Sequence, residues 1–351
     1  MSLLSNLSIV IPTFNRQEYA IRAMHYWKNY DVKVLILDGS KDPIKQSVIS
    51  SIDSNINYYF MPISLMERLY KSTELVKTSY SIMMADDEFF IPSALDSCIK
   101  ELKKDPEIVS CMGSAISFLF KDKKILTNEI YPDLRNHLVN QETPLERSIY
   151  HMSAYTPSSI YSVMRTEIWK KSIRALSYKN FEFYVKSIGE IQFEITSSYL
   201  GKYKIINELM WLRSFENEPI RVHVGEASVP IKDFWYKESN KSIRDEIIDA
   251  ILQSIASEED NMSHLKQDIS QAFDAYIKIT QQSFKYRSVE AILPKSIMTL
   301  IVRLLRFMKS TEKNSLLSIS NITSILYKKG IKVDIDALNE IEKKVLDFHS
   351  K

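Results

Sequence analysis

Short apolar runs alternate with amphipathic stretches along the first third of the chain. The apolar runs are rich in β-branched and aliphatic residues and end at turn-forming or acidic residues, which is typical of buried strands. We expect four such strands, at residues 8–12, 32–37, 56–61 and 80–85. Between them, apolar side chains recur at steps of three and four, which indicates helices packed on a sheet. We expect these helices to open at Asn15, to span 64–77, and to run from Pro92 to Asp105.

This β-α alternation predicts an α/β fold, a Rossmann-like sheet with helices on both faces. Later segments add to the sheet and to its cover. We expect a strand from 108–112, a hairpin over 116–131, a strand at 159–164, a helix over 181–199 closed by Gly201, and a strand at 203–212. No strand alternation follows residue 231, so we divide the chain into an α/β domain, 1–230, and a mainly helical C-terminal region, 231–351.

Composition narrows the function classes. A net charge of +2 over 351 residues predicts no nucleic-acid partner, because such partners select a strongly basic face. Only two cysteines, Cys98 and Cys111, occur, and the chain has neither an export-type leader nor an apolar run long enough to cross a membrane. We therefore expect a cytoplasmic protein.

Polar residues gather where the first, second and fourth strands end. Ligands of open α/β sheets bind at the carboxyl ends of the strands, and these ends carry Thr13 to Arg16, Asp38, and Asp86 to Glu88. The first turn, Pro12 to Arg16, contains no glycine. It therefore differs from dinucleotide-binding and P-loop turns, in which backbone amides approach the phosphates. A nucleotide bound here must be held by side chains and by a metal.

Asp86, Asp87 and Glu88 form an acidic triplet directly after an apolar strand. Adjacent carboxylates repel one another unless a positive charge lies beside them. A hard cation, Mg²⁺ or Mn²⁺, shared with phosphate oxygens meets this need. The other interpretation is a solvated loop ahead of a helix N-terminus, which also favours acidic residues.

Three segments together resemble family 2 glycosyltransferases. They are SIVIPTFNR at 8–16, VLILDGS at 34–40 and SIMMADDEFF at 81–90, and they are most similar to a bacterial subgroup with IPTFNR and ADDD-F segments. The resemblance covers roughly 7–215. It implies a GT-A type nucleotide-sugar-binding domain and sugar transfer from a nucleotide-sugar donor that inverts the anomeric centre.

The resemblance also implies roles for individual residues. Thr13 and Asp38 would contact the nucleoside, Asp86 the ribose and metal, and Asp87 or Glu88 would ligate the metal. Arg68 or Lys71 would face the diphosphate in place of the family's Asn-x-Gly segment; the alternative is an ordinary solvated helix face. The nucleotide-sugar-binding set is completed by Pro12, Asn15, Arg16 and Arg213.

The family's catalytic base is an acidic residue on a late helix before a glycine. Glu190 matches this spacing best, and Glu194 follows one turn later, so both are candidates for accepting the acceptor's proton. Ile191 replaces the acidic residue that usually accompanies this base, which leaves a helix-surface acid as the other interpretation. Relatives place a late histidine on the metal or diphosphate; His223 is the candidate here, although Arg213 lies nearer the expected position.

Residues 294–309 form a basic amphipathic helix by pattern, with apolar side chains on one face and Lys and Arg on the other. Two interpretations stay open: packing into the C-terminal region, or peripheral contact with the inner face of an anionic membrane. We expect a glycosyltransferase of bacterial surface polysaccharide synthesis that acts on a saccharide or lipid-linked acceptor. The alternatives are a catalytically inactive nucleotide-binding scaffold of the same fold and a nucleotidyltransferase.

Overall fold

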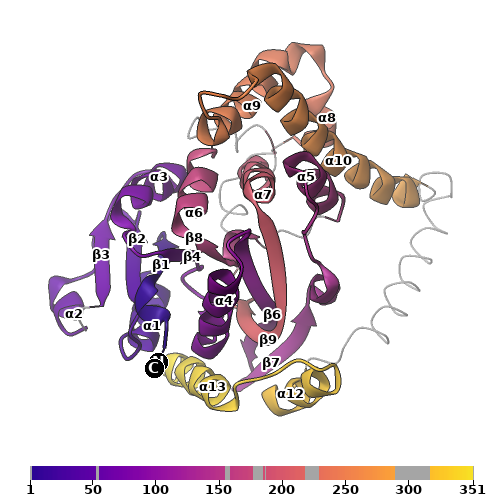
Figure 1. The fold of residues 1–351 in the computed structure, drawn as a ribbon. Coiled ribbons are helices and arrows are strands. Elements are labelled where there is room, and N and C mark those ends of the chain that lie inside the picture. Colours follow the sequence, from indigo (N-terminus) through magenta and orange to yellow (C-terminus); the bar gives the residue numbers. More distant parts are fainter. Residues whose placement is uncertain are drawn as a thin grey trace, which may run out of the picture.

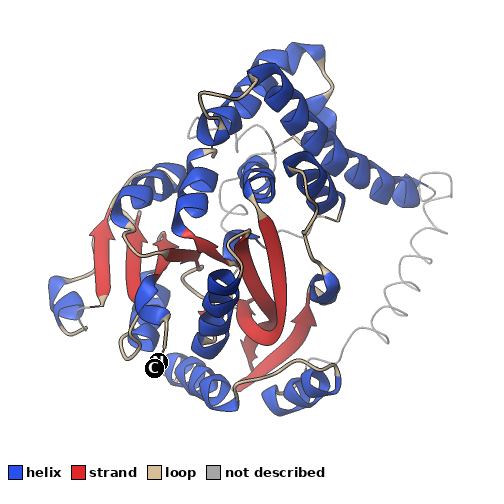
Figure 2. Ribbon diagram, viewed as in Figure 1, coloured by secondary structure: helices blue, strands red, loops and turns tan. Residues whose placement is uncertain are grey.

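The computed structural model describes residues 2–52, 55–154, 159–176, 185, 187–217, 229–288 and 317–350. A twisted mixed sheet runs through the middle of the molecule, with helices on both sides (Figures 1 and 2). In the described residues it has nine strands, ordered β3-β2-β1-β4-β8-β6-β9-β5, with β7 paired to β6. The strands are β1 Leu7–Thr13, β2 Lys33–Asp38, β3 Ile56–Phe60, β4 Tyr80–Met83, β5 Phe89–Phe90, β6 Ile108–Lys121, β7 Lys124–Ile130, β8 Val163–Arg165 and β9 Lys202–Ser214.

The strand directions follow from the connections. β3, β2, β1 and β4 are parallel neighbours, as expected when a helix returns the chain between strands. β8 is antiparallel to both β4 and β6, and β9 is parallel to β6. The long strands β6 and β7 form a hairpin whose turn residues, Asp122 and Lys123, both have positive φ. The carboxyl ends of β1, β2 and β4 therefore meet at one edge.

Alternate residues of the strands point to opposite faces, and each face has its own core. Ile9 and Ile11 pack with one set of helices, and Val10 packs with another. The first set is α1 Gln17–Trp27, α4 Pro92–Lys104, α12 Ile319–Lys328 and α13 Ile335–His349. The second set is α3 Leu65–Leu75 and α6 Thr166–Arg174, joined by Phe193 of α7 Ile188–Leu200. This two-sided cover makes the sheet interior almost entirely apolar.

A third cluster of buried side chains lies above the sheet in Figure 1. It joins α5 Pro144–Ser153 and α7 to α8 Ile231–Trp235, α9 Lys241–Ile255 and α10 Met262–Ser288. The region after residue 230 is thus helical where described, and its helices form two separate groups. The helices α8 to α10 cover α5 and α7, whereas α12 and α13 return to the sheet.

The short elements are η1 Leu4–Asn6, α2 Gln46–Ser50, η2 Pro132–Asn136, η3 Ser159–Tyr161 and η6 Glu238–Asn240. No helix in the described ranges combines the length and apolarity needed to cross a membrane. Both cysteines are free and buried.

The strands predicted at 8–12, 32–37, 56–61, 80–85 and 203–212 are confirmed, as are the 116–131 hairpin and the helices at 64–77 and after Pro92. The strand predicted at 159–164 is wrong in its first half, which is the 3-10 turn η3. There the Ser162 hydroxyl donates to the Ser159 carbonyl, so a serine side chain competes with strand pairing. The helices α2, α5 and α6 were not predicted.

Two boundaries differ for local reasons. Asn15 does not open a helix; it adopts a left-handed φ of 55° in the turn after β1, and α1 begins at Gln17. Gly201 does end α7, but its φ of 174° is extended. Glycine is required there because a Cβ would lie 2.2 Å from Val109 Cγ1. The part of the predicted helix at 181–184 lies outside the described residues.

Candidate functional site

The carboxyl ends of β1 and β2 hold the first group of predicted residues together. Thr13 and Asp38 are register partners at the last position of the two strands. The Thr13 hydroxyl donates to Asp86 Oδ2 at 2.7 Å, which joins the end of β1 to the acidic segment after β4. Pro12 precedes Thr13 in β1, and the Asn15 amide donates to Ser40 Oγ at 2.9 Å. The structure thus brings these polar ends into one place.

Asp38 is fully buried at the centre of a group of polar contacts. One carboxylate oxygen accepts hydrogen bonds from Gln17 Nε2 at 2.6 Å and Tyr58 Oη at 2.7 Å, and the other accepts from the Ser40 amide at 2.8 Å. Burial raises the pKa of Tyr58, so its phenol remains a donor. Gln17 and Tyr58 were missed by sequence reasoning because they belong to a helix and a strand with no motif of their own.

Arg68 ties the ends of β1 and β2 together from below. Its Nη1 donates to the carbonyls of Thr13 and Leu37, at 2.6 Å each, and the residue is 3 % exposed. Burial lowers the pKa of Arg68, while the charges of Asp38 and Asp86 oppose that effect. The solvated helix face predicted for Arg68 is therefore wrong, because backbone carbonyls and two carboxylates attract the guanidinium inward. Lys71 is exposed on the same helix, and its role stays a prediction.

Gly39 leaves room for this arginine. A Cβ on Gly39 would lie 2.4 Å from Arg68 Cζ, and the guanidinium cannot withdraw without breaking both carbonyl contacts. We expect Gly39→Ala to lower the free energy of unfolding by about 1–3 kcal/mol, as overpacking does. Urea unfolding measures this, with the exposed Lys71→Ala as the matched control on α3. Equal stability of Gly39→Ala and wild type would contradict the packing described.

Arg16 neutralises the acidic segment. Its Nη2 lies 2.7 Å from Asp86 Oδ1, and its Nη1 lies 3.3 Å from Asp87 Oδ2. Asn217 Nδ2 also donates to Asp87 Oδ2, at 2.8 Å. Burial raises the pKa of Asp86 to about 7, with the Arg16 charge acting in the opposite direction and the Asp87 charge adding to the rise. The Arg16 contact to Asp86 Oδ1 lacks hydrogen-bond direction, so this buried oxygen retains acceptor capacity.

Glu88 lies apart from this ion pair. It is 5 % exposed, and its Oε2 accepts a hydrogen bond from Trp211 Nε1 at 2.8 Å. Burial raises the pKa of Glu88 to about 8, and the charge of Asp87 adds to the rise. Within the described ranges, no group of three or more His, Cys, Asp or Glu side chains is arranged to hold a metal. The acidic triplet of the sequence is therefore two site carboxylates and one core carboxyl.

The raised pKa of Glu88 has a consequence for stability. Between its ordinary value near 4.5 and about 8, the folded protein binds more protons at this group than the unfolded chain does. Stability therefore falls as pH rises through this range. The side chain of Glu88→Gln can still accept the hydrogen bond from Trp211. We expect the melting temperature of this variant to fall less than that of wild type between pH 5 and pH 9. The exposed Glu74→Gln serves as control; if both variants run parallel to wild type, the described environment of Glu88 is wrong.

Glu190 lies at the start of α7 and is exposed. Burial is the main cause of the strongly raised pKa of Tyr161, and the charges of Glu88, Glu190 and Asp87 add to it. Tyr161 in turn stacks on Trp211, with ring centroids 4.5 Å apart. The charges of Glu190 and of the acidic segment thus act on the same tyrosine, and the role of Glu190 as the base stays a prediction.

Glu194 is buried among polar partners. It is 1 % exposed, its Oε2 lies 2.7 Å from His151 Nε2, and its Oε1 accepts from the Ser159 amide at 3.0 Å. The Ser159 hydroxyl donates to it as well, and His137 extends the network through His151 at 2.9 Å. These contacts favour a structural role for Glu194, and its role as a base stays a prediction. Its contacts hold η3, and therefore Tyr161, against α7.

Arg213 lies on β9 above an aromatic group. Its Cζ is 5.7 Å from the Trp211 ring centroid and 5.8 Å from that of Phe215, and it donates to the Tyr131 hydroxyl. Its charge acts on Glu88, which places it beside the acidic segment. The aromatic residues around it were not predicted from the sequence. His223 and residues 294–309 lie outside the described residues.

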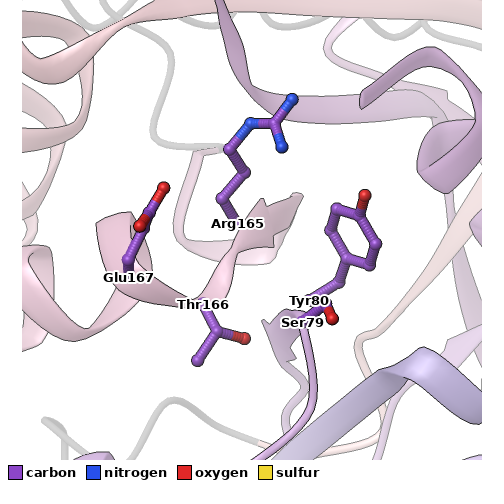
Figure 3. A pocket seen from close by; sticks show the side chains of 5 residues that line it. All are labelled: Ser79, Tyr80, Arg165, Thr166 and Glu167. Carbon is purple, nitrogen blue, oxygen red and sulfur yellow. The ribbon is translucent and has the colours of Figure 1, made fainter. Parts of the chain in front are cut away.

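A cavity of about 310 Å³ lies elsewhere, at the amino end of β4. Figure 3 shows the side chains that line it, Ser79, Tyr80, Arg165, Thr166 and Glu167. The Arg165 guanidinium donates to the carbonyls of Ile108 and Asp105, and Thr166 Oγ1 lies 2.6 Å from Ser81 Oγ. These polar groups already have partners, and the cavity lies at the opposite ends of the strands from the predicted site around Asp38 and Asp86.

Comparison with known proteins concerns the family and the fold. Residues 8–170 match the family model described as Glycosyl transferase family 2. No curated protein matches the sequence. Among solved structures, S. aureus TarS 1-349 in complex with UDP-GlcNAc aligns with a TM-score of 0.50 at 13% identity, over 79% of this chain and 74% of that chain.

Another structure of TarS 1-349 aligns with a TM-score of 0.48 at 13% identity, over 79% of this chain and 73% of that chain. The longer S. aureus TarS aligns with a TM-score of 0.45 at 12% identity, over 77% of this chain and 43% of that chain. At such identities the likeness concerns the fold alone, and the expected GT-A, Rossmann-like α/β sheet is confirmed. Residues 8–170, a little under half of the chain, match glycosyl transferase family 2, and the enzyme class predicted from the sequence, a glycosyltransferase, is that of the matched family.

Proposed function

We propose that the protein transfers a sugar from a nucleotide-sugar donor to a hydroxyl group of a saccharide or lipid-linked acceptor, with inversion at the anomeric carbon. The observation that carries this proposal is the convergence of three groups at one sheet edge. These are the buried Asp38 with its polar partners, the Asp86–Asp87 pair with Arg16, and the exposed Glu190, whose charge acts on Tyr161 beside Trp211. Structures of S. aureus TarS 1-349 are described with UDP-GlcNAc and with UDP, so UDP-sugars are the first donors to test.

The donor's nucleoside would lie on the ends of β1 and β2. Asp38 can accept a hydrogen bond from a base, and Gln17 and Tyr58 keep its carboxylate in place. Thr13 and Pro12 would form the wall beside the base, with Asn15 in the turn above it. Asp86, held by Thr13, would face the ribose.

A divalent cation, Mg²⁺ or Mn²⁺, fits next to the nucleoside. Asp87, with Asp86 beside it, supplies hard carboxylate oxygens, and a diphosphate supplies the rest of the shell. Such a cation would neutralise the charge of the departing diphosphate as a Lewis acid. Glu88 fits less well because its carboxyl group is buried against Trp211. Arg16 and Arg213 would turn their guanidinium groups toward the phosphates, which favour this planar donor pattern.

Glu190 would act on the acceptor. Its exposed carboxylate can take the proton of the attacking hydroxyl, which is the step that a single displacement requires. The acceptor hydroxyl would displace the diphosphate in a single step, which needs one base and no nucleophile from the protein. A single displacement inverts the configuration of the anomeric carbon. The acceptor would belong to bacterial surface polysaccharide or glycolipid synthesis, on the cytoplasmic side, with residues 294–309 as the segment that contacts the membrane.

One observation favours a second candidate, a scaffold that has kept the fold without transfer. Arg16 already pairs with both Asp86 and Asp87, which supplies the positive charge that the two carboxylates need. In that case the protein would bind a nucleotide without turning it over.

The test is thermal unfolding with UDP-, GDP-, CMP- and dTDP-sugars, each with and without Mn²⁺ or Mg²⁺. A ligand that binds only the folded state raises the melting temperature by mass action. We expect a metal-dependent rise with one nucleotide class, followed by transfer or slow hydrolysis of that donor. Binding without any turnover would favour the scaffold. No rise with any nucleotide would contradict both.

A further inference from the structure

The last turn of α13 reaches the acidic site, although it lies far from that site in the sequence. Figure 1 shows α13 beside α1 and β7. The Phe348 ring lies 4.8 Å from the Tyr19 ring of α1, and His349 stacks on Phe120 with ring centroids 4.2 Å apart. His349 Nε2 also lies within hydrogen-bond distance of Glu216 Oε1. The helix thus ends against the loop that follows β9.

Glu216 connects this turn to α1. Its side chain is 3 % exposed, and its Oε2 lies 2.9 Å from Arg22 Nη1, which is equally buried. A buried carboxylate needs compensating charge, and here the partners come from α1 on one side and α13 on the other. The Arg22 guanidinium lies over three rings, 4.7 Å from Phe348, 4.8 Å from Tyr19 and 5.0 Å from Phe89. Arg22 is therefore fixed from both helices.

Arg22 and the residue after Glu216 both end on Asp87. Arg22 Nη2 donates to the Asp87 carbonyl at 2.8 Å. Asn217 Nδ2 donates to Asp87 Oδ2 at 2.8 Å. Arg22 thus fixes the backbone of Asp87, and Asn217 fixes its carboxylate. Both contacts depend on Glu216, which pairs with Arg22 and directly precedes Asn217 in the chain.

We propose that the last turn of α13 is a positioning element of the donor site, with Phe348 and His349 as positioning residues. His349 holds Glu216, Phe348 covers Arg22, and these two partners together fix the orientation of Asp87. The inference rests on the proposed function, in which Asp87 binds the cation beside the diphosphate. It goes beyond that function because it makes α13 part of the site.

The experiment compares His349→Ala with Val345→Ala. Val345 is fully buried in the same helix and packs in the core away from Glu216, so its truncation weakens α13 without removing the contact. Both variants should melt at lower temperature than wild type. The probe is Mn²⁺ with UDP, and the readout is the UDP concentration that half-saturates the folded protein in a calorimetric titration at saturating Mn²⁺.

We expect this concentration to increase about tenfold in His349→Ala, which corresponds to about 1.4 kcal/mol of binding free energy. In Val345→Ala it should stay at the wild-type value. Wild-type affinity in His349→Ala, or an equal loss in both variants, would overturn the proposal, because α13 would then act through general stability alone.

A second measurement separates this proposal from the proposed function. If wild type itself binds no nucleotide, the proposed function fails, and the unfolding of His349→Ala, Asp87→Asn and the double variant decides on α13. Two residues that touch a shared network give non-additive changes in unfolding free energy, whereas independent sites add. Non-additivity supports the positioning contact without any ligand, and additivity overturns it.

Discussion

Asp87→Asn is expected to lose the metal-dependent binding of the donor and to lower the rate of sugar transfer by about 10²-fold or more, as removal of a charge-stabilising group does. The amide is a poor ligand for a hard cation, whereas the carboxylate is a good one. The fold should persist, because the amide oxygen can still accept the hydrogen bond from Asn217. The negative charge of Asp87 also raises the pKa values of Asp86 and Glu88, so its removal should lower both of these pKa values.

The measurement pairs thermal unfolding, with and without Mn²⁺ and the donor, with a transfer assay. Asp31→Asn is a matched control, since Asp31 is exposed and precedes β2, away from the acidic segment. Asp87→Asn should unfold at a temperature close to that of wild type when no ligand is present. A full metal-dependent shift in Asp87→Asn would show that the cation is held elsewhere.

Glu190→Gln is expected to lower the rate of transfer by about 10²–10⁴-fold, the range that a general base contributes. The donor affinity should be unchanged, because Glu190 is exposed at the start of α7 and is not among the residues described around Asp38. Steady-state kinetics should therefore show a fall in kcat at constant KM for the donor.

Glu194→Gln is the informative companion, one turn further along the same helix. Its carboxylate accepts from Ser159 and pairs with His151, so the change should lower the melting temperature. Its effect on the transfer rate of the folded protein should be smaller than that of Glu190→Gln. The opposite ranking of the two rates would assign the base to Glu194 and contradict the structure's arrangement.

Local pattern was sufficient for most of the strands and for the sheet edge at which the polar residues meet. The strands that end at Thr13 and Asp38 are apolar throughout. Their alternate residues point to opposite faces of the sheet, and each face packs against its own layer of helices. Since parallel strands end at the same edge, the polar residues after them had to meet. The same pattern misplaced η3, because serine side chains there bond to the local backbone and apolar periodicity does not register such bonds.

The partners of these residues were decided by the tertiary structure alone. Nothing near Asp87 in the sequence indicates that Arg16, Asn217 and Arg22 would surround it, since they come from the turn after β1, from the loop after β9 and from α1. The two glutamates of α7 have similar local sequence, and only burial separates the exposed one from the one that holds η3. The return of α13 to the sheet was likewise not predicted.

The sequence by itself thus determined the α/β class, the resemblance to family 2 glycosyltransferases and the edge at which a donor would bind. These features depend on side-chain period and on short motifs, both of which are local. Only the tertiary structure decided that Arg68 is a buried tie between strands and that Glu88 belongs to the core. It also decided that Glu216 joins α1 to α13, because burial and charge pairing depend on which distant segments come together.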